Sequence, residues 1–331
     1  MGYRRFYVFI LLLLVGHLPG YLPGQSAKPL LLEDNRELFV DGYLVDKLNN
    51  VTRELHTPVN EGTALKFDKP WEGNFSAYCT IIKDGTLFKL YYRGIREAGK
   101  DGNENEVTCY AESSDGIHWR KPNLGIYDIN GTTDNNVILA HAAPVTHNFS
   151  PFLDKNPNAK ASERYKALGG TDKSGLMVFV SADGIHWRKI RDTAVFNNGV
   201  FDSQNVSFWS ESEQQYVCYF RTWSEGGFTS YKGFRSVSRT TSKDFIHWTA
   251  PVHMTFGDTP LEHLYTNQTS PYFRAPHIYL SICARFMPKR QVLTDEQAKT
   301  LNVNPGYFKD CSDAVLISTR GGSVYDRTFM E

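Results

Sequence analysis

Features that would tie the chain to redox, metal, nucleotide or nucleic-acid chemistry are scarce. Its five cysteines include no C-x-x-C pair and no zinc-ligand spacing, and most lie in apolar strand patterns, where buried free thiols are expected. The chain contains no H-E-x-x-H, no G-x-S-x-G and no phosphate-binding or dinucleotide-binding glycine motif. Its formal net charge is zero, so a nucleic-acid partner is not expected. We therefore expect chemistry that needs no cofactor and no metal, and a structural Ca²⁺ or Na⁺ ion is the alternative left open.

The N-terminal apolar run is too short to span a bilayer comfortably. Arg4 and Arg5 precede this run, Phe6–Val15, and small and turn-forming residues follow it up to Ala27. These three parts are typical of a secretory signal peptide, which we predict at residues 1–27. We expect a secreted or periplasmic protein with no stable membrane insertion after cleavage, and a retained membrane anchor is the alternative.

The chain contains a sequence motif that occurs three times, which we call the repeated phrase. Residues Ser114–Lys121 return almost unchanged as Ala182–Lys189, and a looser copy is Ser242–Trp248. The tryptophans of the three copies lie 68 and 61 residues apart, a spacing typical of a repeat architecture. Asp-Gly in this phrase predicts a tight turn, and the tryptophan beyond it is placed to pack between repeats.

Alternating apolar runs surround each copy and predict four strands per unit. The order is strand, tight turn, strand, longer loop, strand, Asp-Gly turn and strand, which describes one blade of a β-propeller. We expect an all-β, five-bladed propeller of four-stranded blades that is truncated after blade four, with a four-bladed variant as the alternative. The four units run roughly over 70–125, 145–190, 200–250 and 265–330, within a propeller domain of residues 70–331.

Two segments lie outside this regular pattern. Residues 28–69 form a lead-in, and strand-like sequence on both sides of the Asp41-Gly42 turn predicts lead-in strands. Residues 290–305 have a helical pattern and are predicted to be an insertion in blade four.

Candidate site residues come just before the first strand of each blade, because these loops enter the centre of a propeller from one end. Three carboxylates stand there in different blades: Glu72, Asp202 and Glu262. Carboxylates that converge in this way can serve as acid and base on a glycosidic bond. Capping of strand turns is the structural alternative for Glu72 and Asp202.

Other side chains in and near these loops are suited to holding a sugar. The histidines of the repeated phrase recur in every copy and are interpreted as structural. Tyr265 and Trp71 are the predicted stacking platforms. The predicted polar substrate-binding residues are His147, Gln204, Asn205, His263, Asn267 and Arg274.

Over residues 35–331 the chain resembles the five-bladed β-propeller glycoside hydrolases of the family 32 and family 43 type, including exported bacterial proteins similar to the family 32 N-terminal domain. The likeness rests on the repeated Asp-Gly-x-x-Trp phrase, on Leu38–Tyr43 and on the acidic loops. It implies that Asp202 is the orienting carboxylate, Glu262 the general acid and Glu72 the base or nucleophile. The Asn-Asp-Pro-Asn, Arg-Asp-Pro and Glu-Cys signatures of family 32 are absent.

The resemblance implies an exported glycoside hydrolase that acts on an oligosaccharide or polysaccharide. A non-catalytic carbohydrate-binding propeller is the alternative from another class. A sialidase-like enzyme acting on acidic sugars is also kept open, because the repeated phrase resembles the Asp-box and several arginines lie in strand patterns, such as Arg221 and Arg235.

Overall fold

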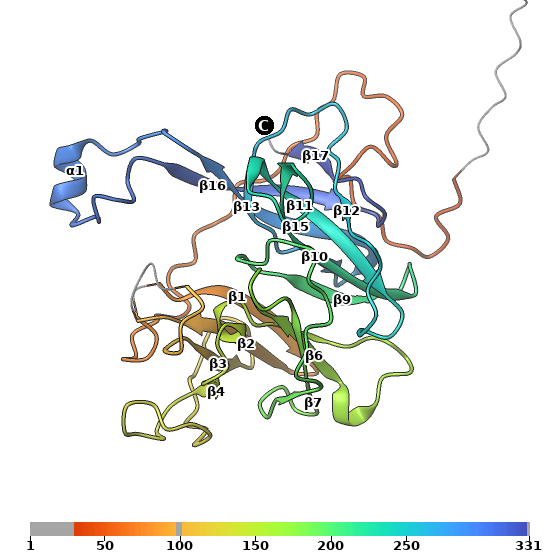
Figure 1. The fold of residues 1–331 in the computed structure, drawn as a ribbon. Coiled ribbons are helices and arrows are strands. Elements are labelled where there is room, and N and C mark those ends of the chain that lie inside the picture. The colour runs from red at the N-terminus through yellow and green to blue at the C-terminus, as the bar shows by residue number, and fades with distance from the viewer. Residues whose placement is uncertain (1–29, 74, 97–100, 330–331) are drawn as a thin grey trace, which may run out of the picture. The chain divides into compact units, whose positions relative to one another are not determined.

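Four antiparallel sheets follow one another along the chain in the computed structural model (Figure 1). It describes residues 30–73, 75–96 and 101–329, so the predicted signal peptide lies outside the described residues. Residues 36–331 form one compact unit. Within the described parts, none of the helices combines the length and apolar character needed to cross a membrane.

We call the four sheets blades one to four. In blades one to three, each strand pairs with the next in a four-stranded meander, whereas blade four has a divided inner strand and therefore five strands. Blade one contains β1 (Ala77–Asp84), β2 (Leu87–Gly94), β3 (Val107–Ser113) and β4 (Val137–Leu139); blade two contains β5 (Ser150–Leu153), β6 (Tyr165–Gly169), β7 (Met177–Ser181) and β8 (Arg188–Lys189); blade three contains β9 (Val206–Ser210), β10 (Gln215–Glu225), β11 (Lys232–Ser242) and β12 (Val252–His253); blade four contains β13 (His263–Thr266), β14 (Ser270–Tyr272), β15 (Ala275–Met287), β16 (Cys311–Thr319) and β17 (Asp326–Phe329).

The innermost strands of successive blades lie against one another. β1 contacts β5, β5 contacts β9, and β9 contacts β14. This radial order is the propeller arrangement, so the predicted all-β propeller is confirmed. The structure shows four blades in its described residues, and the predicted fifth blade and truncation stay a prediction.

The repeated phrase forms the same hydrogen-bonded turn in each of its three copies. In the first copy, Asp115 Oδ1 accepts from the backbone N–H groups of Ile117 and His118, both at 2.8 Å. Its other oxygen lies 2.7 Å from His118 Nδ1. The copies at Asp183 and Asp244 repeat these contacts, so the recurring histidines close turns, as predicted.

The residue that directly follows the turn aspartate has a left-handed backbone conformation in all three copies. Gly116 and Gly184 have φ values of 80° and 79°, which a glycine adopts without steric cost. In the third copy the residue is Phe245, which has a φ of 67° and is buried. The following tryptophan of the second copy, Trp187, packs with its ring 6.3 Å from that of Tyr91 in blade one, so packing between blades is confirmed there.

Buried polar contacts join neighbouring blades at a repeated position. In blade one, Lys89 Nζ donates to the Tyr165 hydroxyl of blade two at 2.8 Å, and that hydroxyl donates to Asp84. Each such contact satisfies a charge that burial would otherwise penalise. The corresponding pairs at the next two interfaces are Tyr216–Asp154 at 2.8 Å and Tyr279–Glu213 at 3.3 Å.

The predicted lead-in strands are wrong for the described residues 30–69, which form turns and extended chain without strand pairing. Instead, side-chain contacts attach the lead-in to blade four. Asp41 and Glu37 accept from Arg320 of blade four at 2.6 and 2.8 Å, so ion pairs hold this segment in place of a backbone ladder. The predicted helical insertion is confirmed as α1 (Asp295–Thr300), at the tip of an arm formed by β15 and β16 (Figure 1).

Candidate functional site

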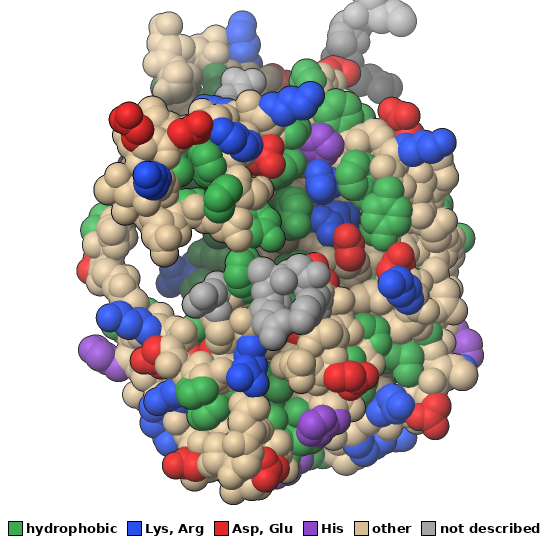
Figure 2. Space-filling view, turned by 60° about the vertical axis from the view of Figure 1, so that its left-hand side comes forward, with side chains coloured by type: hydrophobic (Ala, Val, Ile, Leu, Met, Phe, Trp, Pro, Cys, Tyr) green, Lys and Arg blue, Asp and Glu red, His purple; other side chains and the backbone are tan. Residues whose placement is uncertain are grey.

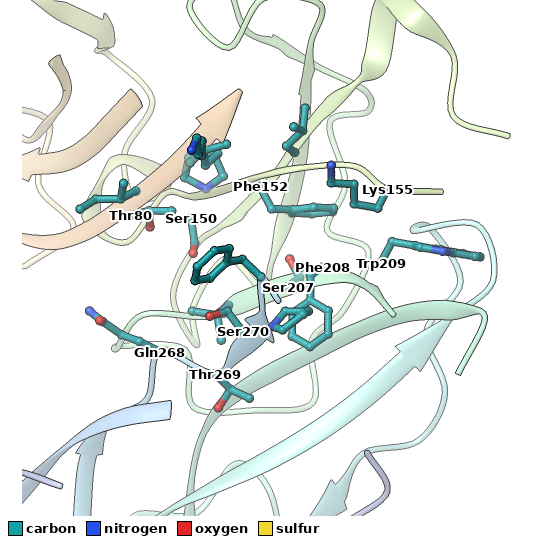
Figure 3. A pocket seen from close by; sticks show the side chains of 18 of the residues that line it. Thr80, Ser150, Phe152, Lys155, Ser207, Phe208, Trp209, Gln268, Thr269 and Ser270 are labelled. Atoms are coloured by element: carbon teal, nitrogen blue, oxygen red, sulfur yellow. The ribbon is translucent and has the colours of Figure 1, made fainter. Parts of the chain in front are cut away.

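The innermost strands of all four blades enclose a cavity of about 790 Å³, which we call the axial cavity. Figure 3 shows side chains from different blades around it, including Thr80 of β1, Phe152 of β5, Ser207 of β9 and Ser270 of β14. Its lining is mainly hydroxyl-bearing and apolar. Among the described residues, its charged side chains are Lys83, Lys155 and Glu211.

A second pocket, of about 510 Å³, lies where the innermost strands begin, and we call it the mouth pocket. Two amide side chains line both spaces: Gln268 Nε2 donates to Gln204 Oε1 at 3.2 Å, and Gln204 Nε2 donates to Thr80 at 3.0 Å. On the face shown in Figure 2, basic, acidic and apolar side chains are intermixed. The mouth pocket is lined by Phe75, Ala77, Tyr78, Arg93, Ile95, Asp101, Gln204, Tyr265, Thr266, Gln268 and Tyr307.

Tyr78 enters the mouth pocket from an irregular point of β1. Its φ of 56° is left-handed, and the pairing register of β1 with β2 shifts between Ala77 and Thr80. Such bulges redirect a side chain at a local cost in backbone energy. The guanidinium of Arg93 lies 4.5 Å from the Tyr78 ring centroid, and burial raises the pKa of the Tyr78 phenol.

Asp202 lies beside this pocket and is fixed by Arg221. Its Oδ1 accepts from Arg221 Nε at 3.0 Å and lies 2.6 Å from Nη2. The same guanidinium donates through Nη1 to the backbone oxygen of Tyr265 at 3.2 Å. Tyr78 adds a contact of 3.4 Å from its hydroxyl to the Asp202 backbone oxygen. The predicted site residues Asp202, Gln204 and Tyr265 are therefore brought together.

The predicted binding residue His147 is buried behind the mouth pocket. Its Nδ1 lies 3.2 Å from Arg93 Nη1 and 3.1 Å from Glu106 Oε1. One group of described residues could hold a metal ion by its geometry. It consists of Asp101, Glu106 and His147, whose ligand atoms lie within 4.8 Å of one another. The positive charge of Arg93 at the shared histidine opposes a cation there, so we assign no metal to this group.

The structure places the predicted site residues Glu72 and Trp71 in the body of blade one. Glu72 is fully buried, lies 2.7 Å from Lys121 Nζ and accepts from the Tyr92 hydroxyl at 2.5 Å. Trp71 Nε1 donates to Asn136 at 2.8 Å within the apolar core of the blade. The side chains of both residues therefore contribute to the interior of blade one.

Glu262 is engaged away from the mouth-pocket lining. Its Oε1 accepts from Arg285 Nη1 at 3.3 Å, and its Oε2 pairs with Arg327. Arg285 also pairs with Asp313 at 2.6 Å. Both oxygens of the predicted general acid are therefore already bound to arginines, and the structure does not group Glu262 with Asp202.

The other predicted binding residues are absent from the lining of the mouth pocket. His263 Nδ1 accepts from the backbone N–H of Arg235 at 3.0 Å, and burial together with Arg235 lowers its pKa. Asn205 and Asn267 are buried in loop turns, where Asn205 Nδ2 donates to two backbone oxygens. Arg274 is exposed in the turn between β14 and β15, at the end of the inner strand remote from the mouth.

Several mouth residues are missing from the sequence prediction. Tyr78 and Arg93 lie inside ordinary strand patterns, and Tyr307 comes from the arm that carries α1. Tyr307 reaches Phe75 with ring centroids 6.1 Å apart. A bulge in β1 and the insertion in blade four place these side chains. Neither effect can be recognised from the alternation of apolar residues in a strand.

No protein-family model matches the chain, and no curated protein matches it. Similar solved structures include an N-acetylgalactosamine deacetylase from F. plautii, at 13% identity and a TM-score of 0.46, with 74% of this chain and 72% of that chain covered. A fructofuranosidase from Schwanniomyces occidentalis is 12% identical, with a TM-score of 0.42 and coverages of 82% and 51%. A GH93 α-L-arabinofuranosidase of Fusarium graminearum is 11% identical, with a TM-score of 0.41 and coverages of 78% and 67%.

Proposed function

We propose that the protein is a glycoside hydrolase that binds its glycan in the mouth pocket. Asp202 carries the proposal. Arg221 fixes its Oδ1, and its Oδ2 has no hydrogen-bond partner among the described residues. A carboxylate held this way, beside aromatic rings and amides, is suited to act on a sugar ring that stacks on Tyr265 or Tyr78.

Hydrolysis needs a proton donor as well as an ionised carboxylate. Asp202, which is ion-paired with Arg221 and keeps one oxygen without a hydrogen bond to the described residues, is the proposed base or nucleophile. Among the described residues, Asp101 is the one carboxylic acid that lines the mouth pocket itself, and it is the proposed donor. The role predicted for Glu262 would require Arg285 and Arg327 to release it.

The second candidate is a carbohydrate-binding propeller without catalysis. It is favoured by the ion pairs of Glu72 with Lys121 and of Glu262 with Arg327, which hold two of the three predicted catalytic carboxylates. In that case, the mouth pocket would bind a glycan end without cleaving it.

Release of sugar from a panel of plant, algal and host glycans tests the proposal. The wild-type protein is compared with Asp202→Asn, Asp101→Asn and Glu262→Gln, and with the exposed Asp134→Asn as control. Release by wild type and control that is lost in Asp202→Asn supports a hydrolase with the assigned carboxylate. Glycan binding without release by any of the proteins supports the non-catalytic propeller.

We also propose that the protein is exported, with residues 1–27 as its signal peptide. The basic residues Arg4 and Arg5, the short apolar run and the small residues that follow support this. Sequencing the N-terminus of the protein recovered from cell fractions tests it. A mature N-terminus near residue 28 is the expected result, and an intact leader on the recovered protein would contradict it.

A further inference from the structure

One guanidinium beside the mouth pocket is not directly paired with a carboxylate of the described residues. The side chain of Arg235, on β11, has no hydrogen-bond or ion-pair partner among the residues that the structure describes. It lies among three aromatic rings, 4.8 Å from the centroid of Trp223, 5.2 Å from Tyr265 and 5.0 Å from Phe286. The three rings surround the guanidinium, and none of its five N–H donors is hydrogen-bonded to a described residue.

This arginine differs from the other arginines of the same blade. Arg239 is bound by Glu213 at 2.7 Å, and Arg221 by Asp202 at 2.6 Å. Burial of a charged group is costly without a partner. Burial, followed by the charge of Arg221, lowers the pKa of Arg235, and the carboxylates of Asp202 and Asp310, which do not pair with it directly, offset this only in part.

Strand register places Arg235 in the same site as Asp202. Arg235 pairs with Trp223 across β10 and β11, and Arg221 lies two residues before Trp223 on β10. Opposite residues and residues two apart share one face of a sheet, so Arg221 and Arg235 are diagonal neighbours. Both guanidinium groups lie over the ring of Tyr265, which lines the mouth pocket.

A second arginine without a carboxylate partner lines the mouth pocket itself. Arg93 contacts His147 and donates to the backbone oxygen of Phe75 at 3.1 Å, and no carboxylate among the described residues pairs with it. Its guanidinium lies over Tyr78, another mouth residue. The pocket and its edge therefore combine aromatic rings with two guanidinium groups, Arg93 and Arg235, with which no carboxylate among the described residues pairs directly.

We propose that the glycan bound in the mouth pocket carries a carboxylate, as a uronic acid does, and that Arg235 is its receptor. A planar carboxylate matches the donor fork of arginine bidentately, whereas lysine offers only a point charge. Tyr265 supplies the platform for the same sugar ring, and Arg93 adds positive charge. This inference rests on the proposed function, since it requires the mouth pocket to take a glycan.

Matched sugars test the inference. Oligogalacturonates, oligoglucuronates and alginate oligosaccharides are each compared with their methyl esters, which keep the sugar skeleton and lose the charge. Binding is measured for wild type, Arg235→Met, Arg235→Lys and the control Arg191→Met, an exposed arginine of blade two. We expect wild type and control to prefer an acid over its ester about tenfold or more, with a preference that weakens as salt rises.

Arg235→Met should bring that preference close to one while leaving affinity for the ester within about twofold, and Arg235→Lys should restore it only in part. Equal binding of acid and ester by wild type, or an unchanged preference in Arg235→Met, would overturn the carboxylate inference alone. Failure of wild type to bind any glycan, neutral or acidic, would overturn the proposed function together with it.

Discussion

The phenolic oxygen of Tyr91 in blade one occupies the space that a Cβ atom on Gly184 of blade two would fill. The turn of one repeat is therefore fitted against the second strand of the preceding blade. Gly116, in the same turn position of blade one, meets only ordinary contacts, the nearest at 3.7 Å from Phe88. Two glycines with the same local role thus differ in what surrounds them.

Replacing these two glycines separates local strain from the clash between blades. Gly116→Ala should cost about 1 kcal/mol, the penalty of a left-handed residue with a side chain. Gly184→Ala should cost about 1–3 kcal/mol more, because Tyr91 and Tyr165 must move. Urea unfolding of both variants measures the difference, and equal destabilisation would contradict the clash.

The contact of Lys89 with Tyr165 should contribute to cohesion between blades one and two. Tyr165→Phe should lower the free energy of unfolding by about 1–2 kcal/mol, since Lys89 and Asp84 lose a buried partner. Lys89→Met combined with Tyr165→Phe completes a double-mutant cycle by urea unfolding. The exposed Tyr231→Phe is the control, and purely additive effects would show that the contact contributes nothing.

Glu72 should matter for stability rather than for catalysis. Glu72→Gln leaves the largely buried Lys121 with only Asp68 as a carboxylate partner among the described residues, and should cost about 3 kcal/mol. Thermal unfolding measures the loss, with the exposed Glu104→Gln as control. Activity per folded molecule should stay unchanged. Loss of activity at unaltered stability would instead restore the catalytic role predicted from the sequence.

The turn carboxylates should make stability fall in acid. Burial by itself would raise the pKa of Asp183, but hydrogen bonds from the side chain and backbone of His186 and the backbone of Ile185 lower it well below its usual range. A lowered folded-state pKa stabilises the protein above about pH 4, and this contribution is lost as the pH falls further.

Urea unfolding between pH 7 and pH 3 tests this dependence. Asp183→Asn should be less stable than wild type at pH 7, and the gap should narrow below about pH 4, because Asp183 takes up a proton in the unfolded wild-type chain before it does so in the folded one. Asp134→Asn, at an exposed position, is the control. A gap for Asp183→Asn that stays constant over the whole range would contradict the lowered pKa.

Part of the site could be predicted, because the order of strands in a propeller places some residues near its centre. Residues that precede the first strand of each blade meet at one end of any propeller, so Asp202, Gln204 and Tyr265 could be placed from the repeat alone. Tyr78 could not, because a bulge in β1 turns it toward the pocket. Tyr307 could not either, because the long arm of blade four brings it to Phe75.

The repeat, the propeller and the Asp-Gly turns could be predicted from the order of the amino acids, because those turns are made by hydrogen bonds between residues two or three positions apart. Which of the predicted carboxylates are available for chemistry depends on contacts that form only in the folded protein. Each of the three carboxylates predicted to share one site forms an ion pair with a basic residue from another strand or a distant loop. These basic residues are Lys121, Arg221 and Arg327. Local pattern fixes a turn, whereas the partner of a charged side chain depends on chain segments that only folding brings near.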